Sequence, residues 1–191
     1  MQASFIVGKI DMRFKVAHLL KQSPGSSKEY SFQEDIGDLD ENLKVKAPLV
    51  GKAKFIRTTD GILATGKAET ELELICDRCL ASFLILIRFP FQEEFHPTVD
   101  INTGASLPID PAEEKENLID ACHIIDLSEV LRQSILLALP VHPLCRPDCR
   151  GLCPQCGQNL NEGSCDCPQP IGDPRLAVLG DLLKRLNLKG E

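Results

Sequence analysis

The stretch Ile62-Leu-Ala-Thr-Gly-Lys-Ala-Glu-Thr-Glu-Leu-Glu-Leu-Ile75 decides the fold. Its charged residues alternate with uncharged ones: Lys67, Glu69, Glu71 and Glu73 are interleaved with Ala68, Thr70, Leu72 and Leu74. Alternation with a period of two is typical of a strand that has one face in water and one in the core. The stretch therefore predicts a long strand of an antiparallel sheet.

Further strands are predicted on both sides of it. Before it, Lys52 to Arg57 leads into Thr59-Asp60-Gly61, a strong two-residue hairpin signal. After it, Phe83-Leu-Ile-Leu-Ile-Arg-Phe89 is apolar at both alternating positions, so we expect it to be buried on both faces. Pro90 is expected to end or bulge this strand before Phe91 to Phe95. The pattern is that of an antiparallel β-meander, a sheet that could close in part.

Two helices are predicted after the strands. Asp126-Leu-Ser-Glu129 has the spacing of a capping box, and apolar residues recur at helical intervals up to Pro140. Asp173-Pro174 offers an N-cap and a first-turn proline for a second helix, whose leucines share one face. The opening, Phe5 to Leu20, is read as a strand and a short helical piece. The predicted class is therefore α+β, a meander with two packing helices and a C-terminal cysteine-rich zinc-binding module.

The predicted division of the chain has three parts. Residues 1–140 form the sheet domain, with an acidic loop over 96–117 and a helix over 126–139. Residues 141–170 form a cysteine-rich metal knuckle, and 171–191 an amphipathic helix that packs on the main domain.

Composition narrows the functional classes. The longest uncharged apolar stretch in the middle of the chain, Leu80 to Ile87, is eight residues, whereas a membrane helix needs about 20. The first ten residues lack a secretory apolar segment, so we expect a cytoplasmic protein without a membrane partner. A net charge of −7 argues against coating nucleic acid by bulk electrostatics. Any RNA contact must be local.

Six cysteines crowd the C-terminal part: Cys145, Cys149, Cys153, Cys156, Cys165 and Cys167. In a reducing compartment such spacings favour metal ligands over disulfides. Cys153-Pro-Gln-Cys156-Gly157 has the form of a metal knuckle, and tetrahedral zinc needs two further ligands. Either Cys145 with Cys149, or Cys165 with Cys167, could supply them. The sequence weakly favours Cys149 plus one or both of the later pair, which would leave Cys145 spare.

Other interpretations of these cysteines carry less weight. Reduced thiols without a metal would be prone to oxidation. The spacing Cys149-x3-Cys153-x2-Cys156 also suits radical enzymes, which hold an iron–sulfur cluster with three thiolates. Those enzymes need a large βα barrel, whereas the strands predicted here are antiparallel. A thioredoxin-like motif should open a helix, and a zinc deaminase needs a His-x-Glu that the chain lacks.

A second pair, Cys76-Asp-Arg-Cys79, falls at the turn between the second and third predicted strands. A structural turn with thiols packed on the sheet is favoured. A metal that bridges this turn and the C-terminal cysteines is left open. The histidines, His18, His96, His123 and His142, share no ligand spacing.

No catalytic constellation stands out, so we expect no enzyme and no small-molecule substrate. The candidate RNA contacts are basic residues of one strand, Lys52, Lys54 and Arg57, joined by Lys44 and Lys46, and a second group, Arg146 and Arg150. The alternative for the lysines is a solvated edge strand, on which lysine discourages aggregation.

Four segments together resemble the large ribosomal RNA subunit accumulation proteins of bacteria and plastids (YceD-like). They are Leu74-Ile-Cys-Asp-Arg-Cys-Leu-Ala-Ser-Phe83, Ile125-Asp-Leu-Ser-Glu-Val-Leu-Arg-Gln-Ser-Ile-Leu-Leu-Ala-Leu-Pro140, Cys149-Arg-Gly-Leu-Cys-Pro-Gln-Cys-Gly-Gln-Asn-Leu-Asn161 and Asp173-Pro-Arg-Leu-Ala-Val-Leu-Gly-Asp-Leu-Leu183. Order and spacing agree over roughly residues 40–188.

The resemblance implies a ribosome biogenesis factor that supports processing or accumulation of large-subunit ribosomal RNA. Its expected partner is the precursor RNA or a ribosomal protein. Some members of the family lack the C-terminal cysteines, which implies a stabilising metal rather than a catalytic one. Two alternatives are an acidic adaptor, which would hold a basic partner through Glu34 to Glu41 and Glu93 to Glu116, and a metal-dependent redox protein.

Overall fold

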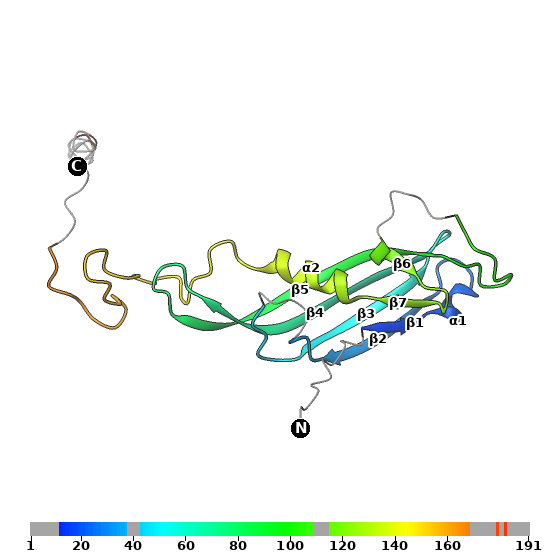
Figure 1. Ribbon diagram of the computed structural model, residues 1–191, viewed down its shortest axis with the longest axis horizontal. Coiled ribbons are helices and arrows are strands. Elements are labelled where there is room, and N and C mark those ends of the chain that lie inside the picture. The colour runs from blue at the N-terminus through cyan, green and yellow to red at the C-terminus, as the bar shows by residue number, and fades with distance from the viewer. Residues whose placement is uncertain (1–11, 38–42, 109–114, 169–178, 180–181, 183–191) are drawn as a thin grey trace, which may run out of the picture.

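The computed structural model describes residues 12–37, 43–108, 115–168, 179 and 182. A five-stranded sheet dominates it, in the order β2 (Ser27–Glu34), β3 (Leu49–Arg57), β4 (Ile62–Ile75), β5 (Ser82–Pro97) and β6 (Leu118–Ile119). Neighbouring strands are antiparallel, except that β6 runs parallel to β5. The β4–β5 ladder extends beyond the other strands, so that its turn stands at one end of the sheet (Figure 1).

One face of this sheet is covered by shorter elements. β1 (Arg13–Lys15) pairs with β7 (Ile124–Asp126) in a second sheet, and α1 (Ala17–Leu20) follows β1 directly. The 3₁₀ turn η1 (Lys115–Asn117) precedes β6, and α2 (Ser128–Ala138) follows β7. α2 lies along β5 (Figure 1).

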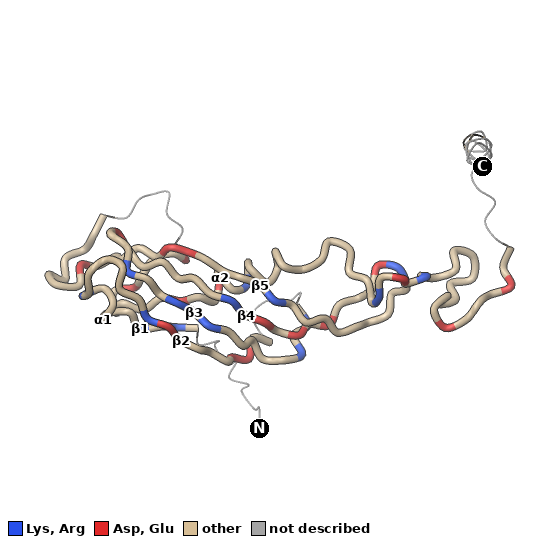
Figure 2. Tube along the Cα trace, turned by 180° about the vertical axis from the view of Figure 1, so that it is seen from behind, with Lys and Arg blue, Asp and Glu red and all other residues tan. Residues whose placement is uncertain are grey.

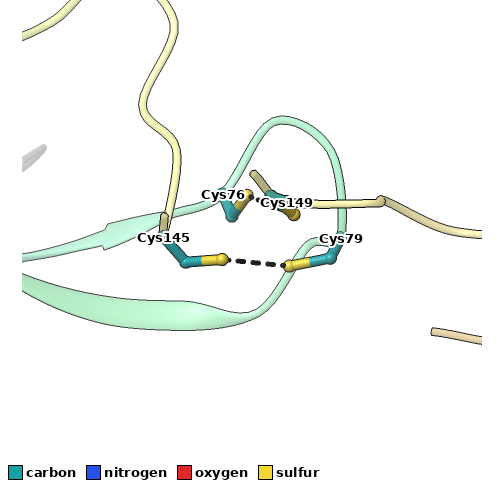
Figure 3. Close-up of side chains that lie close together, drawn as sticks. All are labelled: Cys76, Cys79, Cys145 and Cys149. Atoms are coloured by element: carbon teal, nitrogen blue, oxygen red, sulfur yellow. Dashed lines mark hydrogen bonds between the residues drawn. The ribbon is translucent and has the colours of Figure 1, made fainter. Parts of the chain in front are cut away.

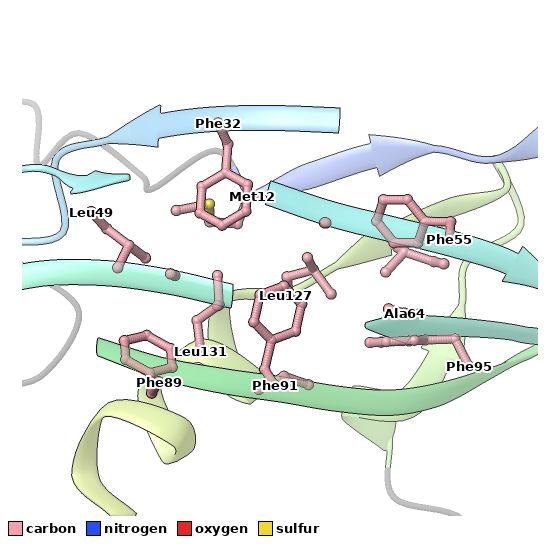
Figure 4. Packing of buried hydrophobic residues seen from close by; sticks show 14 of the residues in the cluster. Met12, Phe32, Leu49, Phe55, Ala64, Phe89, Phe91, Phe95, Leu127 and Leu131 are labelled. Carbon is pink, nitrogen blue, oxygen red and sulfur yellow. The ribbon is translucent and has the colours of Figure 1, made fainter. Parts of the chain in front are cut away.

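The core fills the space between these elements and the inner face of the sheet. Phe55, Phe95, Leu127 and Leu131 are almost completely buried there (Figure 4). Burial alternates along β4, as the charge pattern predicts, because successive side chains of a strand point to opposite faces. Burial of such apolar side chains is the main driving force for folding.

The predicted α+β class with an antiparallel meander is confirmed, but both sheets are open. The third predicted strand continues through Pro90 to Pro97 without a break. β5 pairs with β6 only at His96 and Pro97, so among the described strands the edge of β5 that faces away from β4 is unpaired at Pro90. A proline is tolerated there because no neighbouring strand needs its missing N–H. The expectation that this strand is buried on both faces is wrong for Leu84 and Leu86, which are 56% and 48% exposed.

Other elements add to or correct the predictions. The sequence pattern does not predict β2, whose inner face is marked only by Tyr30 and Phe32. The predicted loop over 96–117 includes the end of β5, a bridge between Val99 and Ser106, and η1. Asp100 holds a turn there, since its Oδ1 accepts hydrogen bonds from the N–H groups of Asn102 and Thr103.

The helix predicted over 126–139 is present as α2. The capping box predicted at Asp126 is wrong in detail, because Leu127 is the cap residue and makes no side-chain cap hydrogen bond. Asp126 Oδ1 accepts the Ser128 N–H at 2.9 Å. The predicted helix over 171–191 lies outside the described residues except for Leu179 and Leu182, which are helical and exposed. Within the described segments, no helix has the length and apolar character to cross a membrane.

Candidate metal centres

Eight of the nine cysteines form two groups of four, and only Cys122 stands apart. The hairpin cluster consists of Cys76, Cys79, Cys145 and Cys149; the C-terminal cluster consists of Cys153, Cys156, Cys165 and Cys167. Within each cluster the sulfur atoms all lie within 4.8 Å of one another. Each cluster could therefore hold a metal ion.

The sulfur spacing of the hairpin cluster matches a single tetrahedral ion. The Sγ atoms of Cys76 and Cys149 are 3.8 Å apart, and those of Cys79 and Cys145 are 3.7 Å apart (Figure 3). A metal–sulfur bond of about 2.3 Å and a tetrahedral angle place two ligand sulfurs about 3.8 Å apart. A disulfide would need about 2.0 Å. The arrangement fits four thiolates around one ion.

The turn between β4 and β5 supplies the first two ligands. The N–H of Cys76 donates to the carbonyl of Ala81, and the N–H of Leu80 donates to the carbonyl of Cys76, both at 2.9 Å. Leu80 has a φ of +57°, in the left-handed region where a leucine is uncommon. This turn brings the sulfurs of Cys76 and Cys79 to the same side.

Backbone contacts hold the segment that follows α2 against this turn. Asp77 N–H donates to Pro143 O at 2.9 Å, and Leu152 N–H donates to Arg78 O at 3.2 Å. The Arg78 guanidinium in turn donates to the carbonyl of Cys149 at 2.9 Å. The two ligand pairs are thus fixed together although a long stretch of sequence separates them.

The hairpin cluster has its own small apolar core. Cys76, Cys79 and Cys149 are 0%, 6% and 2% exposed, and the partly buried Phe83, Leu144 and Leu152 pack against them. Burial of unpaired thiolates is unfavourable, whereas a bound cation would offset their charge.

The pKa values of the thiols diverge within this cluster. Burial opposes ionisation of Cys76, yet backbone N–H groups, led by that of Cys145, lower its pKa to about 6. Burial also opposes ionisation of Cys149, but its pKa is lowered by the Asn161 amide, which donates to its sulfur at 3.3 Å. Burial and the neighbouring thiols raise the pKa of Cys145 to about 12. Without a cation, therefore, the cluster resists carrying a charge on every sulfur.

The C-terminal cluster is built on the predicted knuckle. The N–H of Gly157 donates to the carbonyl of Cys153 at 2.9 Å, and Gly157 has the positive φ, +75°, that the knuckle predicts. The N–H groups of Cys156 and Gln155 lower the pKa of Cys153 to about 6. The side chain of Cys156, followed by burial, raises the pKa of Cys167 to about 12. Cys153 is buried and Cys156 exposed, so this cluster lies nearer to solvent than the hairpin cluster.

The spatial grouping differs from two expectations about which cysteines lie together. Cys149 belongs with the hairpin cysteines and not with the knuckle, and Cys145 is not spare. The pair Cys76 and Cys79 lies in one group with Cys145 and Cys149, as the open alternative of a metal bridging the two regions requires. The iron–sulfur spacing Cys149-x3-Cys153-x2-Cys156 is divided between the clusters. The number of cysteine pairs could have indicated this grouping from the sequence, because four closely spaced pairs supply the eight ligands of two four-cysteine sites.

Neither cluster includes a histidine, in line with the absence of ligand spacing among these residues. Four protein ligands close a metal site, whereas catalytic zinc sites keep a position open for water or substrate. An ion held by all four cysteines of either cluster would have no ligand position left for water or substrate.

The predicted RNA contacts do not form one surface. Lys52 and Lys54 point outward from β3, but Arg57 has the opposite parity and donates from Nη1 to Gly61 O at 2.7 Å in the β3–β4 turn. Lys46 pairs with Glu73 at 2.7 Å. Lys44 accepts the Glu73 N–H through its backbone carbonyl.

The second group of predicted contacts lies in the cysteine-rich segment. Arg146 Nη2 donates to Asn161 Oδ1 at 2.6 Å, and the backbone N–H of Arg150 donates to the same oxygen at 2.8 Å. This segment contacts the far end of the β4–β5 hairpin, whereas Lys52 lies opposite Lys67 within the ladder of β3 and β4. The two groups are separate.

Comparison with known proteins places the chain in a family. The sequence model of the large ribosomal RNA subunit accumulation protein YceD matches residues 64–183, more than half of the chain. The matched region includes both ligand pairs of the hairpin cluster, the knuckle and α2. No solved structure matches the chain.

Curated relatives agree with this match. An uncharacterised protein of Mycobacterium tuberculosis (strain ATCC 25618 / H37Rv) is 34% identical over 126 residues, which cover 65% of this chain and 57% of the relative. The chloroplastic large ribosomal RNA subunit accumulation protein YCED homolog 1 of Arabidopsis thaliana is 28% identical over 171 residues, 77% of this chain and 50% of that protein. The homolog of the same name in Zea mays is 30% identical over 152 residues, 64% and 49% of the two chains.

The chain spans about half the length of these curated relatives. The part matched by the family model nevertheless contains most of the β4–β5 ladder, helix α2 and the cysteine pairs of both clusters. The chain belongs to the YceD family of large ribosomal RNA subunit accumulation proteins.

Proposed function

We propose that this protein is a ribosome biogenesis factor that supports the accumulation of large-subunit ribosomal RNA. Family membership is the observation that carries the proposal, together with relatives named for this role. The closed cysteine sets, which leave no ligand position for substrate, support a binding role rather than an enzymatic one. The partner is the precursor RNA or a ribosomal protein bound to it.

Each cysteine cluster holds one zinc ion in this proposal. Four thiolates in tetrahedral array suit zinc or an iron–sulfur centre. Sulfurs within 4.8 Å of one another leave room for one ion rather than a multinuclear cluster. The free thiols also favour a reducing compartment, and we propose the cytoplasm. Metal analysis of the purified chain should find about two zinc ions per molecule, and a metal-free protein with reactive thiols would contradict this.

The biological role is tested by deletion of the gene. Ribosomal particles from the deletion strain are separated on a sucrose gradient, and large-subunit RNA precursors are probed in each fraction, with small-subunit RNA as internal control. We expect a deficit of large subunits, unstable or unprocessed large-subunit RNA, and recovery when the wild-type gene is restored. A normal profile, with no tagged protein in the precursor fractions, would contradict the role.

An adaptor that binds a basic protein is the second candidate. It is favoured by the outer face of the distal β4–β5 hairpin, where Glu71 lies opposite Leu86. Glu73 lies opposite Leu84 on the same face and already pairs with Lys46. Exposed apolar side chains bordered by acids suit a basic amphipathic segment. Competition between RNA and a ribosomal protein for the purified chain separates the two candidates.

A further inference from the structure

The outer face of the main sheet, opposite the core, is hollowed. A hollow of about 1480 Å³ lies over β2, β3, β4 and β5. Its charged lining residues are the basic Lys52, Lys54, Lys67 and Arg88 and the acidic Glu29 and Glu69. Pockets for small molecules usually measure about 300–1,000 Å³. The hollow therefore suits a segment of a macromolecule better than a metabolite.

Basic side chains meet across the middle of this hollow. Lys52 of β3 lies directly opposite Lys67 of β4, and Lys54 is two residues along on the same face. Residues in such positions have Cβ atoms about 5 Å apart, and like charges placed there destabilise a sheet. Figure 2 shows basic residues on β3, β4 and β5, across the middle of the sheet.

Lys52 and Lys67 have no carboxylate directly opposite them in the described sheet, whereas Lys54 lies opposite Glu29 of β2, which also lines the hollow. Across the described part of the chain, no carboxylate forms an ion pair with Lys52, Lys54 or Lys67. Arg88 differs, because its Nε pairs with Glu69 at 2.7 Å. An anion bound between the two ammonium groups would relieve the repulsion of the Lys52–Lys67 pair.

The chemistry of the lining indicates which anion. Ser31, Thr65 and Gln92 add hydroxyl and amide groups beside the lysines, and such groups hydrogen-bond phosphate oxygens. The phenylalanines of the lining, Phe32, Phe89 and Phe91, are buried in the core, so the face has no aromatic platform for bases. Recognition would therefore be of the sugar–phosphate backbone and not of sequence.

We propose that this hollow docks the phosphate backbone of RNA, with Lys52 and Lys67 as the central contacts and Lys54 beside them. The inference rests on the proposed role in ribosomal RNA accumulation and names the surface that serves it. It removes Arg57, Arg146 and Arg150 from the contact set and adds Lys67. Because binding is electrostatic, it weakens as salt rises.

A charge reversal tests the proposal. The affinity of the full chain for a fluorescent single-stranded fragment of large-subunit RNA is measured by anisotropy at several salt concentrations. Lys52→Glu combined with Lys67→Glu should weaken binding at least tenfold and reduce the salt slope by about 1 to 2, because each phosphate that a lysine neutralises adds about 0.7 to that slope. The control, Lys15→Glu with Lys21→Glu, makes the same change in net charge at exposed positions outside the hollow.

The single variant Lys52→Glu serves as the control for correct folding. It converts the repulsive pair into an attractive one, so its Tm should not fall below that of the wild type while RNA affinity drops. Unchanged RNA affinity in the double variant would overturn the proposal. The proposal would also be overturned if the double variant still bound RNA but no longer crosslinked in cells to an acidic protein that the wild type contacts.

The failure of this inference is distinguishable from failure of the proposed function. If the deletion strain has a large-subunit RNA defect and the double variant corrects it fully while binding RNA as the wild type does, the role stands and the docking surface is wrong. If the deletion strain has no defect, the role itself is wrong, whatever the purified protein binds.

Discussion

At the residue scale, the cysteines of the hairpin cluster carry the clearest chemical consequence. Cys76 is fully buried, and its sulfur lies 3.8 Å from that of Cys149. Loss of one ligand from a closed four-thiolate set removes metal affinity and leaves the other thiols buried together.

Cys76→Ser should therefore lower the zinc content by about one ion per chain and leave the C-terminal cluster loaded. Metal analysis with a chromogenic chelator measures this. Cys122→Ser is the matched control, because Cys122 is exposed and belongs to neither cluster. Equal zinc content in Cys76→Ser and wild type would show that Cys76 is not a ligand.

A glycine in the middle of the sheet has a packing role. A Cβ at Gly66 would overlap the carbonyl oxygen of Lys52 and the ring of Phe91. Gly66→Ala should lower the free energy of unfolding by about 1–3 kcal/mol, because neither the backbone nor the buried ring can move aside freely. Urea denaturation checks this. Gly37→Ala, whose Cβ would meet only Asp35 at 3.4 Å, should change stability much less.

At the element scale, α2 closes the core over β5. Its inner side chains Val130, Leu131 and Ile135 are buried, whereas Leu137 on the same helix is 86% exposed. Apolar burial, rather than helix propensity, is thus what holds this helix in place.

Leu131→Ala should cost about 2–5 kcal/mol of unfolding free energy, since it removes a buried side chain and leaves a cavity. Leu137→Ala should stay within about 0.5 kcal/mol of the wild type. Thermal and urea denaturation of both variants measure the difference. Equal effects would mean that α2 does not pack on the sheet as described.

At the scale of the whole molecule, two apolar cores are separate. Among the residues that the structure describes, the main buried cluster contains no cysteine, and the cysteines of the hairpin cluster pack with Phe83, Leu144 and Leu152 instead. Metal removal should consequently loosen the end of the β4–β5 hairpin and leave the sheet folded.

Hydrogen exchange with and without a chelator tests this separation. The N–H groups of Asp77 and Leu152, which bond to Pro143 and Arg78, should exchange at least tenfold faster without metal. Amides within the ladder between β3 and β4 should keep their protection and serve as the internal reference. A uniform loss of protection would indicate that metal binding and folding of the sheet are a single event.

The local sequence pattern determined several elements of this protein: β4, the β3–β4 turn, α2 and the knuckle. The alternation from Ile62 to Ile75, the Asp60-Gly61 turn and the helical spacing before Pro140 each depend on neighbours in sequence, and β4, its hairpin and α2 follow them. The knuckle Cys153-Pro-Gln-Cys156-Gly157 is local in the same way, because one turn sets the geometry of its sulfurs. Thiol spacing alone likewise predicted that the C-terminal cysteines gather into a group that could hold a metal.

Only the tertiary structure decided which cysteines belong together and which charges meet. Cys76 and Cys149 are far apart in sequence and come within 3.8 Å because the segment after α2 folds back onto the β4–β5 turn. Lys52 and Lys67 face each other because of strand register, and the exposure of Leu84 and Leu86 follows from a sheet covered on one side. Such contacts depend on chain topology, which spacing along the sequence does not encode.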